Sequence, residues 1–314
     1  MAKIAVVFPG QGSQYVGMGK TLVEQFGSTK KLFDQANEAL GFDLMKICFE
    51  GPEDELKKTE FTQPAILTVS AVCLEALRSF KNLKVEAVAG HSLGEYTALY
   101  YGGAISFKDA VKIVNLRGKF MQSAVPLGEG TMAAIMGLEK AKVDEICKQA
   151  SSKGVVEAAN INSPIQIVIS GKKEGVLKAI DLATKAGAKR AIELKVSAPF
   201  HSSLMKKAAD QLAEALNKIE IKDSTVPVVS NVTADYTTKA DQIKDLLIRQ
   251  MTSSVLWVDS INKLVNDGFD TFIEIGPGKV LTGLIKRMAP KAKLHNISDA
   301  DTLGKFLQVW REEL

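Results

Sequence analysis

The sequence predicts an α/β protein in which a small domain is inserted into a larger one. In the N-terminal part, short apolar runs that suit buried parallel strands alternate with segments of helical spacing. In the middle of the chain the expected order changes to strand-helix-strand-strand-helix-strand, a self-contained ferredoxin-like unit. The length of 314 residues also exceeds what one hydrophobic core usually serves. A large domain with an insertion, or two domains, is therefore expected.

The N-terminal elements begin with a continuous apolar run that stops at Pro9, as expected of a buried strand in a parallel sheet. Gly41 is suited to end a helix and Pro64 to begin one. Ser106 and Asp109 have the spacing of a capping box. The elements expected here are strands over 4–8 and 85–89 and helices over 22–40, 64–80, 93–101 and 106–121.

The inserted unit follows a glycine-containing linker over 126–130. Its expected strands cover 131–137, 155–159, 165–171 and 190–196, and its expected helices cover 139–150 and 173–187. The chain then continues with a helix over 204–219, a strand over 271–275 and a last helix over 301–313. We therefore expect a small domain over 125–196 inserted in a large domain made of 1–124 and 197–314.

Composition excludes several classes of protein. The net charge of +4 comes from 40 basic and 36 acidic residues, too small an excess to indicate a nucleic-acid partner. The cysteines, Cys48, Cys73 and Cys147, are odd in number and scattered, which argues for a reducing compartment and against disulfides or structural zinc. The N-terminal apolar run is too short for a signal peptide, and no run approaches the roughly 18 residues of a membrane span. We expect a cytoplasmic protein with no membrane partner.

The turn Gly90-His91-Ser92-Leu93-Gly94 is the strongest chemical signal. It has the Gly-x-Ser-x-Gly pattern and lies between an expected strand and an expected helix. A sharp strand-to-helix turn exposes the serine hydroxyl, and the helix N-terminus offers N–H groups to an oxyanion. The alternative is an ordinary glycine-containing loop. The context favours a nucleophile at Ser92.

A serine hydroxyl needs a base to become a nucleophile, and the chain contains three histidines. His91 adjoins Ser92 and is expected to hold the turn. His295 lies in a short apolar segment and is expected to pack within a strand. His201 lies between an expected strand and an expected helix, where functional side chains gather. Elimination favours His201, with His91 and His295 as the alternatives.

Two glycine-rich segments near the N-terminus resemble nucleotide-binding motifs, but each lacks a required glycine. Gly17-Met18-Gly19-Lys20-Thr21 resembles the end of a P-loop, with Gln14 where that pattern needs glycine. Gly10-Gln11-Gly12 resembles a dinucleotide fingerprint, with Tyr15 where the third glycine belongs. What remains is a glycine-rich loop whose backbone N–H groups could complete an oxyanion hole beside Ser92.

Six segments match a known family in order and over nearly the whole chain. They are FPGQGSQ at 8–14, TQPA at 62–65, AGHSLGEY at 89–96, ANINSP at 159–164, FHSSLM at 200–205 and EIGPG at 274–278. On these segments the chain resembles the malonyl-CoA:acyl-carrier-protein transacylases of fatty-acid synthesis. The resemblance implies an α/β-hydrolase-like large domain with an inserted ferredoxin-like small domain.

The resemblance also assigns roles to individual residues. Ser92 would carry malonyl as an ester, and His201 would act as base and then as acid. The backbone N–H groups of Gln11 and Leu93 would form the oxyanion hole. Arg117 would bind the malonyl carboxylate, for which a planar guanidinium is suited because it pairs in a bidentate manner.

Gln250 takes the place of the usual acid of a Ser-His-Asp triad in this resemblance. Its backbone carbonyl would accept the other ring proton of His201 and so fix the tautomer. From spacing alone, Asp235 and Asp241 compete for that role.

Three further residues match family positions that line the substrate site. Phe200 goes with malonyl in related acyltransferases, because a bulky ring would crowd the branch of methylmalonyl; its alternative role is packing. Asn160 and Asn162 also match, and their alternative role is that of structural asparagines in a turn.

The implied reaction is a ping-pong transfer of malonyl from malonyl-CoA through Ser92 to the phosphopantetheine thiol of acyl carrier protein. It implies neither a metal nor a redox cofactor, since the coenzyme A thioester is a substrate. Two other classes stay open: a serine hydrolase sharing the turn, and a non-catalytic module that binds the carrier protein.

Overall fold

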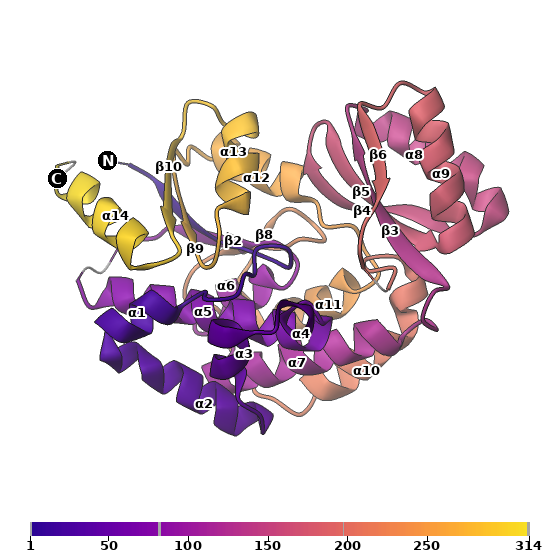
Figure 1. Cartoon of the computed structure of the whole chain (residues 1–314). Helices are drawn as coiled ribbons and strands as arrows, with labels where there is room; N and C mark the ends of the chain where they lie inside the picture. Colours follow the sequence, from indigo (N-terminus) through magenta and orange to yellow (C-terminus); the bar gives the residue numbers. More distant parts are fainter. Residues whose placement is uncertain (1, 81–82, 197, 313–314) are drawn as a thin grey trace.

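The computed structural model describes residues 2–80, 83–196 and 198–312, and two β-sheets organise them (Figure 1). The first sheet has the order β10-β9-β1-β2-β7-β8. Neighbouring strands in this sheet run parallel, except that β7 and β8 are antiparallel. The strands are β1 (Ile4–Phe8), β2 (Ala87–Gly90), β7 (Val228–Val229), β8 (Tyr236–Thr237), β9 (Thr271–Ile275) and β10 (Lys293–Ile297).

The register of the first sheet sets the position of two loops. β1 and β2 are parallel neighbours, and Phe8 pairs with Gly90 at their carboxyl ends. The glycine-rich loop after β1 and the turn containing Ser92 after β2 therefore leave the sheet at the same edge. Ligands of open α/β sheets bind at this edge.

Apolar layers cover both faces of the first sheet, as expected of a buried parallel sheet. Val6, Phe8 and Val88 face one layer, whereas Ala5 and Val7 face the other. In Figure 1, α5, α6 and α7 lie on the first side and α12 and α13 on the second. The helices of this part are α1 (Lys20–Gln25), α2 (Lys30–Leu40), α3 (Leu44–Glu50), α4 (Glu53–Leu56), α5 (Thr59–Arg78), α6 (Gly94–Tyr101), α7 (Phe107–Ser123), α10 (Lys206–Leu216), α11 (Ala240–Gln250), α12 (Trp257–Asn266), α13 (Val280–Met288) and α14 (Ala300–Glu312).

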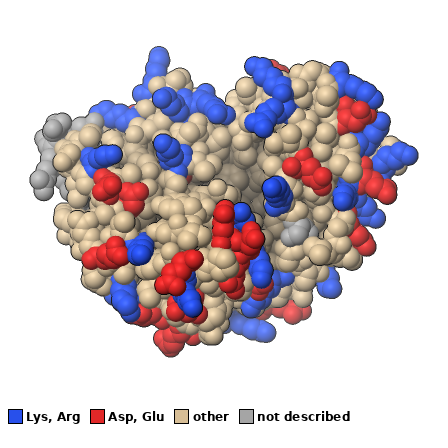
Figure 2. Space-filling view, in the orientation of Figure 1, with Lys and Arg blue, Asp and Glu red and all other residues tan. Residues whose placement is uncertain are grey.

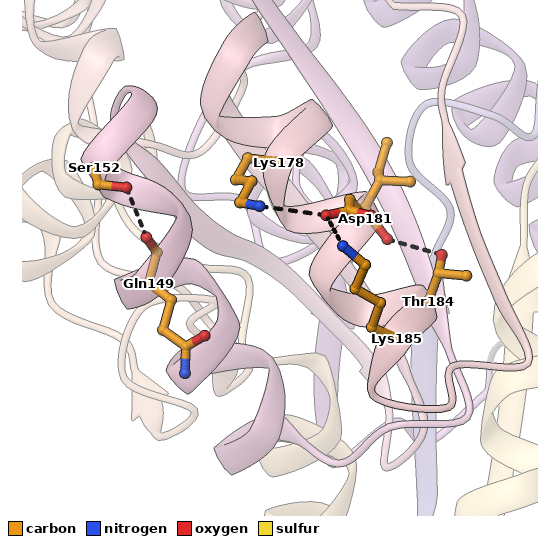
Figure 3. Close-up of polar contacts among 7 residues, drawn as sticks. Gln149, Ser152, Lys178, Asp181, Thr184 and Lys185 are labelled. Carbon is orange, nitrogen blue, oxygen red and sulfur yellow. Dashed lines mark hydrogen bonds and ion pairs between the residues drawn. The ribbon is translucent and has the colours of Figure 1, made fainter.

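The second sheet is antiparallel and has the order β4-β5-β3-β6. Its elements are β3 (Gly130–Met136), α8 (Lys140–Ala150), β4 (Val156–Ser163), β5 (Gln166–Lys172), α9 (Lys173–Lys185) and β6 (Arg190–Glu193). The predicted strand-helix-strand-strand-helix-strand order is thus confirmed. Ile135 of β3, Ile146 of α8 and Val176 of α9 share a core of their own. The exposed side of α9 carries Asp181 between Lys178 and Lys185 (Figure 3).

A cleft separates the parts of the molecule built on the two sheets (Figure 2). The loops that follow the carboxyl ends of β1 and β2 line a pocket in this cleft. Among the described residues, no helix is long and apolar enough to span a membrane.

Several predicted elements differ from the structure. The helix predicted over 22–40 is broken into α1 and α2, because Phe26 leaves helical geometry and a 3₁₀ turn covers Gly27–Thr29. The strand predicted over 190–196 ends at Glu193. The predicted domain boundary at residue 197 and the end of the last helix at residue 313 lie outside the described residues. The elements that the sequence analysis did not predict are α3, α4, β7, β8, α11, α12 and α13.

Pro64 is not at the start of its helix, because α5 already begins at Thr59. A proline has no N–H to donate to the carbonyl four residues earlier, here that of Glu60. The Asn115 side chain of α7 donates to that carbonyl instead, at 2.8 Å. Gly118 follows one turn later, where a Cβ would lie 2.7 Å from the Thr59 carbonyl oxygen. The proline and the glycine thus let α7 pack closely against α5.

Candidate active site

Ser92 occupies a tight turn that only its flanking glycines allow. Its φ of 51° lies in the left-handed region, which is strained for a residue with a side chain. A Cβ on Gly90 would lie 1.9 Å from the Gly94 carbonyl carbon, and one on Gly94 would lie 2.2 Å from the Phe8 carbonyl oxygen. The two glycines are therefore required because α6 packs closely against the end of β2 at Gly90 and against the end of β1 at Gly94.

His201 contacts the Ser92 hydroxyl. Its Nε2 lies 2.7 Å from Oγ, and its Nδ1 lies 2.9 Å from the backbone carbonyl oxygen of Gln250. Because a carbonyl can only accept, the proton is on Nδ1, and Nε2 is free to accept the serine proton. Burial, and then the nearby Arg117 charge, lower the pKa of His201 to about 3. The imidazole is therefore neutral near pH 7.

The Gln250 carbonyl can serve His201 because α11 ends there, and the last carbonyls of a helix have no partner within it. This end of the helix also carries the negative end of its dipole, which favours a positive imidazolium. Asp235 and Asp241 are exposed, and Asp241 lies in the first turn of α11, at the opposite end from Gln250. The structure does not bring either aspartate to His201.

Arg117 of α7 is 1% exposed and points at the nucleophile. Its Nη2 donates to Ser92 Oγ at 3.1 Å and to Gln250 Oε1 at 2.9 Å, and its Nη1 donates to Gln63 Oε1 at 2.7 Å. The guanidinium also lies 5.5 Å from the centroid of the Tyr96 ring. These acceptors are uncharged, and the described residues include no ion pair of Arg117 with an acidic side chain. A buried positive charge therefore lies beside Ser92 and contacts neutral groups.

The remaining predicted residues line one pocket with Ser92, His201 and Arg117, with an empty volume of about 680 Å³. Asn160 and Asn162 lie on strand β4, so the interpretation of these residues as turn asparagines is wrong. The pocket lies between the two sheets, because Ser92 follows β2 whereas the asparagines belong to β4. The other predicted residues in its lining are Gln11, Leu93 and Phe200.

The two alternative histidines have structural partners. His91 Nε2 lies 2.7 Å from Asn162 Oδ1, and its ring packs edge-on against Trp257. It therefore links the Ser92 turn to β4. His295 lies on β10 and packs edge-on against Phe306, as expected of a packed strand histidine.

Gln63, Glu95 and Asn231 belong to the polar network of the site and were missed by the sequence analysis. The Asn231 side chain accepts from the Ser92 N–H at 2.7 Å and donates to the Gly90 carbonyl at 2.7 Å, so it supports the turn. Gln63 and Glu95 stand inside the matched segments TQPA and AGHSLGEY, which is a signal that could have identified them. Asn231 lies outside every matched segment.

Comparisons with known proteins give the family. A family model described as an acyl transferase domain matches residues 5–308. The chain belongs to the acyl transferase domain family. This match, together with relatives named malonyl CoA-acyl carrier protein transacylase, confirms the resemblance inferred from the sequence motifs.

Two relatives cover nearly the whole of this acyl transferase. A malonyl CoA-acyl carrier protein transacylase of Bacillus subtilis (strain 168) is 50% identical over 314 residues, which is 100% of this chain and 99% of the relative. The crystal structure of a malonyl CoA-acyl carrier protein transacylase from Clostridium perfringens is 46% identical, with a TM-score of 0.95 over 99% of this chain and 98% of that one. The mixed α/β fold with two sheets therefore matches those of solved acyl transferases.

A third similar structure contains a partner protein. It is a malonyl-transacylase in complex with its type II PKS acyl-carrier protein, 42% identical to this acyl transferase. Its TM-score is 0.95, over 98% of this chain and 99% of that one.

Proposed function

We propose that this protein is an acyl-carrier-protein S-malonyltransferase of fatty-acid biosynthesis, which moves malonyl from coenzyme A to acyl carrier protein through an ester on Ser92. The observation that carries the proposal is the position of Arg117. A serine hydrolase needs the serine and the histidine, but a buried guanidinium 3.1 Å from the nucleophile suits an acyl group that ends in a carboxylate.

In the first half-reaction, Ser92 Oγ gives its proton to His201 Nε2 and attacks the thioester carbonyl carbon of malonyl-CoA. The negative oxygen that forms would be stabilised by the backbone N–H groups of Gln11 and Leu93. Leu93 immediately precedes α6, so its N–H points out of a helix N-terminus, whereas the Ser92 N–H is already bound by Asn231. When the intermediate collapses, coenzyme A leaves as a thiolate and takes the proton from His201.

In the second half-reaction, the phosphopantetheine thiol of acyl carrier protein gives its proton to His201 and attacks the malonyl ester. Collapse of the second intermediate returns the proton to Ser92 Oγ. Both half-reactions move one acyl group and one proton, with no change of oxidation state. The proposed reaction therefore needs neither a metal nor a redox cofactor.

Arg117, Phe200, Asn160 and Asn162 are proposed to bind the acyl group. The guanidinium would hold the terminal carboxylate, and the Phe200 ring would limit the space at the α-carbon. The asparagines face the nucleophile from β4, and Asn162 also fixes His91.

For the fold, we propose an α/β-hydrolase-like large domain of 1–124 and 197–314 with a ferredoxin-like domain of 125–196 inserted in it. The strand order β4-β5-β3-β6 of the antiparallel sheet, with α8 and α9 on one face, supports the second assignment. The parallel order of β9, β1 and β2, with the nucleophile after β2, supports the first. The cytoplasmic location stays a prediction.

The test is to incubate the protein with labelled malonyl-CoA and locate the label by mass spectrometry. We expect a malonyl ester on Ser92 and its transfer when holo-acyl carrier protein is added. Ser92→Ala should abolish labelling and lower turnover by about 10⁵-fold or more. Ser152→Ala, an exposed serine beyond α8, is the matched control and should label normally.

Two outcomes would contradict the proposal. Rapid release of free malonate without transfer would indicate a serine hydrolase. Binding of carrier protein without any label on Ser92 would indicate a non-catalytic module.

A further inference from the structure

Glu95 is a buried acidic residue to which the proposed reaction gives no role. It stands three positions after Ser92, in the first turn of α6, and its side chain is 2% exposed. Its Oε2 accepts from Gln250 Nε2 at 2.7 Å and from the Asn231 backbone N–H at 3.1 Å. Burial raises the pKa of Glu95 to about 7, and these donors oppose the rise. Because burial disfavours the ionised carboxylate, we looked for a contact through which Glu95 affects the site.

The Gln250 side chain joins Glu95 to Arg117. Its Nε2 faces the Glu95 carboxyl, and its Oε1 accepts from Arg117 Nη2 at 2.9 Å. The amide therefore has its donor end toward the acid and its acceptor end toward the guanidinium. If the Gln250 side-chain amide were rotated by 180°, its NH₂ would face the guanidinium of Arg117, and its oxygen would face the ionised Glu95 carboxylate. Both contacts would then be repulsive. The Ser92 backbone carbonyl also accepts from Nε2, at 3.1 Å, so Glu95, with the shorter contact at 2.7 Å, acts together with it to select one of the two orientations.

This orientation determines where Arg117 points. The same Nη2 that donates to Gln250 Oε1 also donates to Ser92 Oγ at 3.1 Å, so loss of the amide oxygen frees the end of the guanidinium that faces the nucleophile. At the opposite side, Gln63 Oε1 holds Nη1 and would keep Arg117 in the pocket. A misplaced amide should therefore misalign the guanidinium without expelling it.

We propose that Glu95 is a positioning residue for recognition of the acyl carboxylate: by accepting from Gln250 Nε2 it fixes the amide whose oxygen aligns Arg117 beside Ser92. The inference rests on the proposed malonyl transfer and adds a determinant of its specificity. Glu95 does not touch the substrate in this scheme. It acts through the amide, and it favours malonyl over acyl groups that lack a terminal carboxylate.

The test compares Glu95→Ala with Glu95→Gln. Alanine removes the shortest contact of Gln250 Nε2 and leaves it the Ser92 carbonyl at 3.1 Å and Asn231 Oδ1 at 3.4 Å. Glutamine keeps an oxygen that can accept from Gln250 Nε2 and from the Asn231 N–H. The matched control is Glu274→Ala, a fully buried glutamate of β9 whose carboxylate accepts from the Leu281 and Thr282 N–H groups, outside the pocket lining. For each variant, kcat/KM is measured with malonyl-CoA and with acetyl-CoA, and folding is checked by thermal unfolding.

We expect Glu95→Ala to lower the malonyl-to-acetyl ratio of kcat/KM by about 10-fold, the size expected for a lost hydrogen bond to a charged group. Glu95→Gln should keep the ratio within about 3-fold of the wild type, since it restores the acceptor. Glu274→Ala should lower stability and leave the ratio unchanged. Equal losses for the two substrates in Glu95→Ala, or a ratio in Glu95→Gln as low as in Glu95→Ala, would overturn the inference.

A second measurement keeps the inference testable if Glu95→Ala does not fold. Glu95→Asp, whose carboxylate is one carbon shorter and withdrawn from Gln250 Nε2, should lower the malonyl-to-acetyl ratio in the wild type and cause no further change in an Arg117→Ala background, because the group that Glu95 aligns is gone. A further fall in the ratio would overturn the inference. Failure of the proposed function is distinguishable, because the wild type itself would then form no malonyl ester on Ser92.

Discussion

Two regions of the molecule make polar contacts of the same length in opposite surroundings. On the exposed side of α9, Lys185 Nζ lies 2.9 Å from the Asp181 carboxylate, and the side chains are 69% and 45% exposed (Figure 3). In the pocket, Arg117 Nη2 lies 2.9 Å from Gln250 Oε1, and Arg117 is 1% exposed. The α9 contact pairs two full charges, whereas the pocket contact pairs a charge with a neutral amide.

The comparison indicates that burial, rather than formal charge, determines how strongly such a contact affects stability and neighbouring groups. Water and salt screen the ion pairs of α9, so these pairs contribute little to the stability of the folded protein. Arg117 is buried, so its charge is weakly screened and acts strongly on its neighbours. Neutral amides anchor the guanidinium and leave its charge available to an anionic acyl group. A direct ion pair with Glu95 would have neutralised that charge, and the Gln250 amide keeps the two apart.

Replacement of Arg117 should produce the largest contrast between the regions. In Arg117→Ala we expect kcat/KM for malonyl-CoA to fall by about 10²–10³-fold, because the acyl carboxylate loses its buried partner. Acetyl-CoA should lose far less, since it has no carboxylate to bind. Arg117→Lys should lie between, because lysine keeps the charge and loses the planar fork. Equal losses for both substrates would refute the carboxylate-binding role.

The burial of His201 predicts a pH-dependent stability that the α9 region lacks. Its pKa is about 3 in the folded protein and 6.5 in the unfolded chain. Below pH 6.5 the unfolded chain binds a proton that the folded protein does not. The stabilisation is therefore complete above pH 6.5 and is lost as the pH falls toward about 3, by at most about 1.4 kcal/mol per pH unit.

His201→Asn isolates this effect from that of other groups. Denaturant unfolding at about pH 7, 6 and 5 should show the wild type losing more stability than the variant on acidification. Parallel losses would mean that His201 takes up its proton normally in the folded protein.

The sequence predicts the site best where the chemistry is local. Ser92 and its glycines are five consecutive residues between a strand and a helix, and His201 follows from the small number of histidines. The Gln250 carbonyl is different, because any residue at the end of α11 has one and the side chain gives no signal. Its assignment came from the family resemblance alone.

The network behind Ser92 could not be predicted because its contacts join distant parts of the chain. Glu95 and Gln250 are 155 positions apart, and Ser92 and Asn231 are 139 apart. In the fold, the same limit explains why strong local patterns such as β3 to α9 were found, whereas the two-residue strands β7 and β8 were not. Such short strands are stabilised by hydrogen bonds to neighbouring strands, and their own two residues form no recognisable pattern.

A substitution at Phe200 tests whether the shape of the pocket contributes to the choice of acyl group. Phe200→Ala should raise the preference for methylmalonyl-CoA over malonyl-CoA by about 10-fold, because discrimination of one methyl group is worth about 1–3 kcal/mol. Met132→Ala, a buried residue in the same lining, is the control for a general loss of packing. The ratio of kcat/KM for the two substrates is the measurement. If both variants shift the ratio equally, Phe200 only packs.

Asp181→Asn should have the smallest effect, although it removes a carboxylate with two cationic partners. The hydrogen bonds from Lys185 and then Lys178 lower the pKa of Asp181. Both lysines remain solvated when the partner is neutralised, so no charge is left buried and unpaired. We expect kcat/KM for malonyl-CoA and the unfolding midpoint to match the wild type within error, at low and at high salt. A loss of activity like that of Arg117→Ala would show that α9 is coupled to the pocket, and burial alone would then not explain the difference between the two regions.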